Sequence, residues 1–126
     1  MVEAPARPGP SPSVAVVVCA YSLERWADLR EAVASLEGQT TAPSELIVVV
    51  DHNPALADVA RRTFGERVTV IENAHARGLS GARNTGIACA SSDVVAFLDD
   101  DASAASGWLE RLAAWFRDDA VGAVGG

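Results

Sequence analysis

Short runs of consecutive apolar residues alternate along this chain with longer segments whose apolar residues recur every three or four positions. The runs occupy 14–19, 46–50, 68–71 and 94–98 and are apolar throughout except for Thr69. Runs of this length and composition predict strands that are buried on both faces of a sheet. The run at 68–71 is the shortest of the four, so we expect it to lie nearer an edge of the sheet.

The segments between the runs carry residues that typically begin and end helices. Ser22 is predicted to cap a helix that ends at Gly38, because the apolar positions between them recur at helical spacing. Asn53 and Pro54 form a capping residue and first-turn pair for a second helix, which Gly65 is predicted to end.

Two more helices and part of a strand are predicted further along the chain. One helix is expected over 80–90, after a loop that contains glycine. Ser106 is predicted to cap the last helix. The apolar stripe of that helix consists of Trp108, Leu109, Leu112, Trp115 and Phe116. Residues 121–124 have the pattern of a strand that has barely begun.

Alternating strands and helices predict an α/β fold, a Rossmann-like three-layer sandwich with a mostly parallel sheet. Right-handed crossovers place the carboxyl end of every strand at one edge of such a sheet, and ligands bind at that edge. Polar residues follow three of the predicted strands: Tyr21 follows the first, Asp51 the second and Asp99–Asp101 the fourth. We therefore expect these side chains to converge on one rim.

Composition and charge narrow the class of protein. The 126 residues suffice for one domain, and residues 1–13, which hold four of the six prolines, are expected to be a flexible lead-in to a domain over 14–126. The net charge is −7, with ten arginines and no lysine. This balance argues against non-specific binding to nucleic acid or to a membrane surface, because both require a basic face.

The two cysteines, Cys19 and Cys89, are far apart in the sequence and lack the spacing of a metal site. We expect both to be small buried thiols in a reducing compartment. The apolar run before Cys19 is too short to span a membrane, and no basic cluster precedes it as in a signal peptide. A cytoplasmic location is the expectation.

The three adjacent carboxylates of Asp99–Asp101 have two interpretations. They can form a solvated turn before the next helix, since Asp favours turns. Alternatively, Asp99 and Asp101 can reach one hard divalent cation, whose charge would relieve the repulsion between them. Magnesium is usually held by one or two carboxylates plus substrate phosphates, so the second interpretation predicts a site for a metal and a diphosphate.

A second candidate segment is RGLSGARNTG, residues 77–86. It contains glycine, opens a predicted helix and carries Arg77 and Arg83, all of which suit a phosphate. It matches neither the P-loop nor the G-x-G-x-x-G pattern, so a plain turn with Arg83 on a solvated face is the alternative.

Single polar residues at the same rim leave further alternatives open. Asp51 lies where an acidic residue often contacts a ribose or a base, although a solvated strand end explains it equally well. Tyr21 either lines the pocket or covers an edge. His52 and His75 are expected to be surface residues without a catalytic role.

Four segments, taken in order, resemble the N-terminal half of family 2 glycosyltransferases. They are the stretches VAVVVCAYSLERWADLREAVASLEGQT, ELIVVVDHN, GLSGARNTGIACA and VVAFLDDDA. The resemblance covers residues 13–126 and implies the GT-A fold. It also implies transfer of a sugar from a nucleotide diphosphate donor to an acceptor that the sequence does not identify.

The resemblance assigns a role to each matching residue. Asp101 would bind the divalent metal, Mn or Mg, with help from Asp99, and Asp99 or Asp100 would contact the donor ribose. Asp51 matches a base-binding aspartate, which implies a UDP-, GDP- or dTDP-linked sugar. The remaining residues implied to lie around the nucleotide and its diphosphate are Cys19, Ala20, Tyr21 and Arg83.

Two departures from the family pattern limit what the resemblance implies. Val50-Asp51-His52-Asn53 stands where the family usually has paired acids followed by small residues, which leaves the base open. Family members also continue into a region that forms the acceptor site and carries the catalytic base of inverting enzymes. We therefore expect this chain to be a truncated GT-A domain that supplies the donor-binding half and lacks that base.

Two further expectations follow from a chain that stops after the last helix. The strand at 94–98 would be an exposed sheet edge, so we expect self-association. A stand-alone nucleotide-binding module that acts with a partner chain is the alternative function. A nucleotidyltransferase-like or dinucleotide-dependent enzyme is disfavoured, because its glycine-rich motifs are missing.

Overall fold

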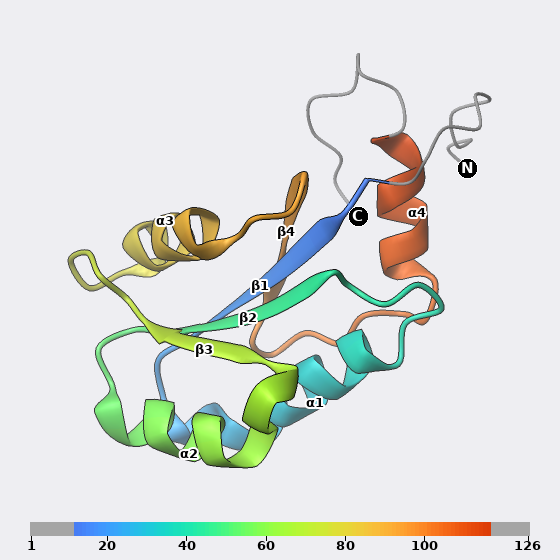
Figure 1. Ribbon diagram of the computed structural model, residues 1–126. Helices are drawn as coiled ribbons and strands as arrows, with labels where there is room; N and C mark the ends of the chain where they lie inside the picture. The colour runs from blue at the N-terminus through green and yellow to red at the C-terminus, as the bar shows by residue number, and fades with distance from the viewer. Residues whose placement is uncertain (1–11, 117–126) are drawn as a thin grey trace.

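A computed structural model describes residues 12–116, which form one parallel sheet with helices on both faces (Figure 1). The strands are β1 (Val14–Ala20), β2 (Glu45–Val50), β3 (Thr69–Glu72) and β4 (Val94–Asp99). Their order in the sheet is β3-β2-β1-β4, and each neighbouring pair is parallel. The predicted α/β sandwich with a parallel sheet is confirmed, and so is the place of β3 at an edge. The strand predicted at 121–124 lies outside the described residues.

Helices follow the strands as the apolar spacing predicts. They are α1 (Trp26–Glu37), α2 (Pro54–Phe64), α3 (Leu79–Cys89) and α4 (Trp108–Trp115). Two short 3-10 turns, Leu23–Arg25 and Gly65–Arg67, lie before α1 and after α2. None of the helices within 12–116 is long and apolar enough to cross a bilayer.

Local capping chemistry explains where the first two helices begin and end. The Ser22 hydroxyl accepts a hydrogen bond from the Glu24 amide and so caps the 3-10 turn that leads into α1. The Asn53 side chain accepts from the Leu56 amide at the start of α2. Gly65 ends α2 with a φ of +60°, which glycine adopts without strain.

The prediction that Ser106 caps the last helix is wrong. Gly107 is the residue that precedes α4, and no side chain close in sequence caps it. The Oε1 atom of Gln39 instead accepts from the Leu109 amide at 2.9 Å, while its Nε2 atom donates to the Ala105 carbonyl. The cap therefore comes from about 70 residues away, and local spacing does not encode such a contact.

Alternate residues of each strand face two different helical layers. The larger layer packs α1, α2 and α4 against one face, around core residues such as Val16, Val48 and Leu29. On the other face α3 packs against a smaller apolar set that includes Val17 and Val49. β1 and β2 are thus covered on both sides, which explains their continuous apolar sequences.

Helix α3 lies unusually close to the sheet because of Gly86. A Cβ atom added at Gly86 would come within 2.6 Å of the Val17 side chain and 3.3 Å of the Val49 side chain. Only a residue without a side chain allows this approach. The close contact holds α3 against β1 and β2, and residues of its first turn line the functional site.

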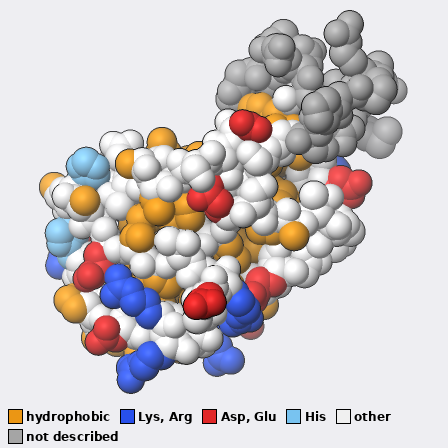
Figure 2. All heavy atoms as spheres, in the orientation of Figure 1, with side chains coloured by type: hydrophobic (Ala, Val, Ile, Leu, Met, Phe, Trp, Pro, Cys, Tyr) orange, Lys and Arg blue, Asp and Glu red, His pale blue; other side chains and the backbone are white. Residues whose placement is uncertain are grey.

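The outer surface is charged over α2, whereas β4 is less covered than the central strands. Figure 2 shows basic and acidic side chains along the lower edge and apolar side chains in the middle of the same view. Arg61 lies 3.8 Å from Glu72, and Arg67 lies 3.0 Å from Glu37. β4 ends the sheet formed by the described residues and is only half-buried. Self-association through this strand remains a prediction.

Candidate functional site

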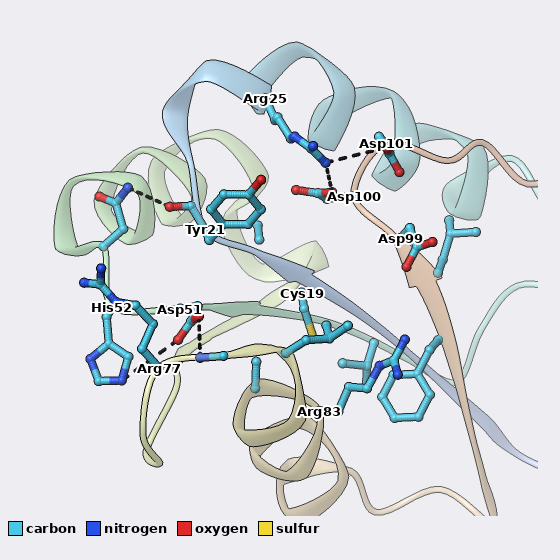
Figure 3. Close-up of a pocket in the computed structure, with 18 residues that line it drawn as sticks. Cys19, Tyr21, Arg25, Asp51, His52, Arg77, Arg83, Asp99, Asp100 and Asp101 are labelled. Carbon is cyan, nitrogen blue, oxygen red and sulfur yellow. Dashed lines mark hydrogen bonds and ion pairs between the residues drawn. The ribbon is translucent and has the colours of Figure 1, made fainter.

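A pocket of about 700 Å³ opens at the carboxyl ends of β1, β2 and β4 (Figure 3). Because β2 and β4 lie on opposite sides of β1, the strand order reverses at this point. Such a reversal separates the loops that follow neighbouring strands and leaves a crevice between them. The fold therefore places the pocket where a parallel α/β sheet ordinarily binds a ligand.

The structure brings every predicted site residue to this pocket. Those that line it are Cys19, Ala20, Tyr21, Asp51, Arg83, Asp99, Asp100 and Asp101. In Figure 3, Asp51 lies at one end, Asp99–Asp101 lie at the other, and Cys19 lies between them. The expected convergence on one rim is confirmed, while the binding role of each residue remains a prediction.

Asp51 is held firmly by the protein itself. Its side chain is 11% exposed, and its Oδ2 atom accepts from the Gly78 amide at 2.9 Å. Its Oδ1 atom accepts from the Nδ2 atom of Asn73, also at 2.9 Å. The His52 imidazole lies 3.9 Å from the same oxygen. Two donated hydrogen bonds fix the carboxylate before any ligand arrives.

His52 completes this end of the pocket in an uncommon backbone conformation. Its φ is +52°, a region that His enters more readily than most residues, and its Nε2 atom lies 2.8 Å from the His75 carbonyl. A carbonyl only accepts hydrogen bonds, so Nε2 carries the proton in this contact. His52 is exposed, as expected for a surface residue, but it also lines the pocket and is bonded to the loop opposite. That it has no catalytic role remains a prediction.

Asp99, Asp100 and Asp101 form the other end of the pocket, called the acidic end below, and few positively charged side chains lie near them. Arg25 NH1 lies 3.3 Å from Asp100 Oδ1 and 3.6 Å from Asp101 Oδ2, and its guanidinium also stands 5.5 Å from the centre of the Tyr21 ring. One arginine, whose side chain is 41% exposed, therefore serves two carboxylates. Figure 3 shows it reaching both from the turn that precedes α1.

Asp100 is the most constrained of the three acids. The residue is 6% exposed, and its Oδ2 atom is buried without a hydrogen-bond partner among residues 12–116. Burial raises the pKa of the Asp100 carboxyl, and the attraction of Arg25 opposes that shift. A buried acceptor without a donor is costly, so this end of the pocket is electrostatically incomplete.

The donor set at the acidic end suits a hard divalent cation. Asp99 and Asp101 offer carboxylate oxygens at the exposed surface of the pocket, which are the ligands that Mg²⁺ and Mn²⁺ prefer. No group of three or more His, Cys, Asp or Glu residues within 12–116 is arranged to hold a metal alone. A cation at this point would have to take further ligands from water or a substrate.

The floor of the pocket carries a cysteine and an arginine. Burial raises the pKa of the Cys19 thiol to about 11, while Arg83 acts in the opposite direction. The Arg83 guanidinium stands 5.2 Å from the centre of the Phe97 ring. Arg83 is thus held over β4 within the pocket, and Cys19 is an uncharged thiol at neutral pH.

Sequence reasoning missed several residues that shape the site. Arg25 and His52 line the pocket but were not among the predicted site residues, and Asn73 donates a hydrogen bond to Asp51. His52 directly follows Asp51, a signal that could have placed it at the rim. Arg25 and Asn73 gave no such signal, because their roles depend on contacts with residues 75 and 22 positions away.

Comparison with known proteins identifies the family of this chain. The model of the family described as glycosyl transferase family 2 matches residues 15–126. A glucosyl-dolichyl phosphate glucuronosyltransferase from Haloferax volcanii is 43% identical over 117 residues, which cover 90% of this chain and 37% of that protein. A pre-mycofactocin glycosyltransferase from Mycobacterium tuberculosis is 37% identical over 98 residues, or 76% of this chain and 20% of that protein.

A solved structure shares the fold. The mannosyltransferase PcManGT from Pyrobaculum calidifontis, determined in complex with GDP-Man and Mn²⁺, superposes with a TM-score of 0.73 at 25% sequence identity. The match covers 96% of this chain and 37% of that one, so the chain spans little more than a third of PcManGT and of the Haloferax relative, and a fifth of the Mycobacterium one. Sequence and fold agree, and the chain belongs to glycosyl transferase family 2, with the α/β architecture of the GT-A type.

Proposed function

We propose that this chain supplies the donor-binding part of a glycosyltransferase that takes its sugar from a nucleotide diphosphate sugar with the help of a divalent metal. The observation that carries the proposal is the placement of Asp51 and Asp99–Asp101 at opposite ends of one pocket at the strand-order reversal. A nucleotide with a metal-bound diphosphate needs such a pair of ends, one for the base and one for the cation.

The acidic end would hold the metal through Asp101 and Asp99. A divalent cation bound there would neutralise part of the diphosphate charge and stabilise the diphosphate as a leaving group. Asp100, held by Arg25, would support the turn that presents these two carboxylates, or contact the ribose. Arg83 at the pocket floor supplies a positive charge that suits the diphosphate.

The opposite end would receive the base. Asp51 has an acceptor-only carboxylate, which suits the ring N–H of uracil, thymine or guanine. Cys19, Ala20 and Tyr21 line the wall between the two ends, and Tyr21 is 54% exposed within the pocket. An exposed aromatic ring at this position offers a flat apolar surface to a nucleotide.

Two relatives support the choice of donor. PcManGT was determined with GDP-Man and Mn²⁺, and the Haloferax relative is named as a glucuronosyltransferase. We propose a UDP-, GDP- or dTDP-linked sugar for this chain, with Mn²⁺ or Mg²⁺, and a reaction on the cytoplasmic side of the cell. The acceptor would be bound by the part of the family domain that this chain does not span.

Calorimetric titration of UDP, GDP and dTDP into the full chain tests the proposal. Each nucleotide is titrated with Mn²⁺, with Mg²⁺ and with EDTA. We expect one nucleotide to bind and its affinity to fall when the metal is removed. Binding that is indifferent to metal would overturn the metal part of the proposal, and no binding of any nucleotide would overturn the donor site.

A further inference from the structure

We propose that Asn73 is a positioning residue that sets the geometry of the base end through Asp51, without contacting the ligand. Asn73 directly follows β3, is 7% exposed and is not among the residues that line the pocket. Its influence would therefore pass through its neighbours. The choice of a nucleotide as the ligand rests on the proposed function.

The Asn73 amide makes four hydrogen bonds, and they fix which way it faces. Its Nδ2 atom donates to Asp51 Oδ1 at 2.9 Å and to the Ala76 carbonyl at 3.1 Å. Its Oδ1 atom accepts from the His75 amide and from the Thr85 hydroxyl, both at 2.9 Å. The Asp51 carboxylate and the Ala76 carbonyl only accept and the His75 amide only donates, so the opposite orientation would break these three bonds, whereas the Thr85 hydroxyl can donate or accept.

These bonds tie three segments together. Asp51 follows β2, Ala76 and His75 belong to the loop at 74–78, and Thr85 belongs to α3. The Gly78 amide, from the same loop, donates to the other carboxylate oxygen of Asp51, Oδ2. The network therefore holds the carboxylate at a fixed position relative to a loop that also carries the pocket residue Arg77.

Close packing leaves this arrangement little freedom. A Cβ atom added at Gly81 would lie 2.7 Å from the Ala76 carbonyl oxygen and 3.4 Å from Asn73 Nδ2. The Thr85 hydroxyl also lies 3.1 Å from the Gly81 carbonyl and accepts from the Ala74 amide. The loop at 74–78 is thus pressed against the first turn of α3, and Asn73 is the side chain that joins both to Asp51.

The substitution Asn73→Asp makes a specific test, because aspartate has almost the same shape as asparagine. Its carboxylate would face the Asp51 carboxylate at hydrogen-bond distance, and two such groups disfavour joint ionisation. When the pair shares one proton, the protonated partner donates to the other and restores the lost bond. Nucleotide binding by Asn73→Asp should therefore be poor at high pH and recover as the pH falls.

The experiment measures affinity from pH 5.5 to 8 for the full chain, with UDP, GDP and dTDP as probes in the presence of Mn²⁺. Each value is divided by that of the unmodified chain, because the other titratable and charged groups around the pair, namely His52, Cys19, the pocket carboxylates, Arg77 and Arg83, are present in both proteins. We expect Asn73→Asp to bind roughly thirtyfold more weakly at pH 8 and within about threefold at pH 5.5. A ratio that does not change with pH would overturn the proposal.

Asn84→Asp is the matched control. Asn84 lies on the exposed surface of α3, outside the pocket, and the substitution adds the same charge. We expect it to leave both the affinity and its pH profile unchanged. A recovery at low pH in this variant too would mean that the added charge acts at long range, and would overturn the proposal.

Substitutions at Thr85 cover the case in which Asn73→Asp does not fold. Thr85→Val keeps the shape but removes the hydroxyl that holds Asn73, and should weaken binding roughly fivefold, while Thr85→Ser should retain it. Equal affinities for the two variants would overturn the proposal.

Amide hydrogen exchange at Gly78 separates this inference from the proposed function. The Gly78 amide should be protected in the unmodified chain and lose protection at pH 8 in Asn73→Asp. If the unmodified chain binds no nucleotide, the proposed function fails, and the positioning role is judged on Gly78 alone. Unchanged protection would then overturn it.

Discussion

The two ends of the pocket differ in how completely the protein satisfies its own charges. At one end both oxygens of Asp51 accept hydrogen bonds, from Asn73 and Gly78. At the other end Asp100 and Asp101 share one half-exposed arginine, and a buried oxygen of Asp100 has no partner among residues 12–116. The first end is rigid before a ligand binds, whereas the second holds an excess of negative charge that an added cation would offset.

The two sets of acids are also held by different parts of the fold. Asp51 is fixed by a loop and a helix that pack closely on the sheet, so its position is set by the folded chain. Asp99 is the last residue of β4, which ends the described part of the sheet, and Asp100 and Asp101 form the turn that follows it. On the proposed function, the rigid end recognises the base and the charged end assembles around the metal.

Replacing Asp51 with asparagine should affect the molecule most. One of the two donors, Asn73 or Gly78, would face the new amide nitrogen and lose its acceptor. We expect nucleotide affinity to fall roughly thirtyfold and unfolding free energy to fall by about 1–3 kcal/mol. Calorimetry and urea denaturation measure the two effects. Asp58→Asn, on the exposed side of α2, is the control, and an equal loss there would contradict the special place of Asp51.

Gly86→Ala should disturb the same end through packing alone. The added methyl group would meet Val17 at 2.6 Å and push α3, with Thr85, away from β1. We expect a loss of about 1–3 kcal/mol in unfolding free energy, as for other overpacked cores. Gly38→Ala is the matched control, because its Cβ would meet only the Ala34 carbonyl at 3.5 Å. Similar stabilities for the two variants in urea denaturation would refute the close approach.

Asp100→Asn should reveal the unsatisfied charge of the acidic end through its pH dependence. The pKa of Asp100 is raised above its usual value of 3.8, so the folded chain binds more protons than the unfolded chain just above that pH. Stability of the unmodified chain therefore falls as the pH rises through this window, and the penalty persists at higher pH. Asparagine does not titrate and escapes the penalty.

The measurement is urea denaturation in EDTA from pH 3.5 to 7. We expect the stability of Asp100→Asn relative to the unmodified chain to increase with pH across this range. A difference that stays constant would mean that Asp100 carries no burial penalty.

Cys19, which lies between the two ends, reports on both of them through the reactivity of its thiol. Carboxylates from both ends, Asp51 and Asp100 among them, act with burial to raise its thiol pKa to about 11. In a Cys89→Ala background, alkylation of Cys19 at pH 8 should be on the order of 100-fold slower than that of a free cysteine. Adding Arg83→Gln should slow it further, because Arg83 lowers the pKa. A rate equal to that of a free thiol would contradict this environment.

The sequence predicts the scaffold well because its signals are local. Four apolar runs and their flanking caps specify the strands and most helix ends, and the parallel topology then brings Tyr21, Asp51 and Asp99–Asp101 to one edge. Helix α4 shows where local signals fail, since its cap is Gln39 rather than Ser106. The roles of Asn73 and Arg25 could not be predicted for the same reason, because both residues act through contacts that only folding creates.

The central claim is that the acidic end binds a divalent cation together with a nucleotide held at the other end. The most direct test is calorimetric titration of the nucleotide into the unmodified chain and into Asp101→Asn, each with Mn²⁺ and with EDTA. The account predicts that Mn²⁺ strengthens binding to the unmodified chain at least tenfold, and that Asp101→Asn removes this gain while weak metal-free binding survives. An equal gain from Mn²⁺ in both proteins would contradict it.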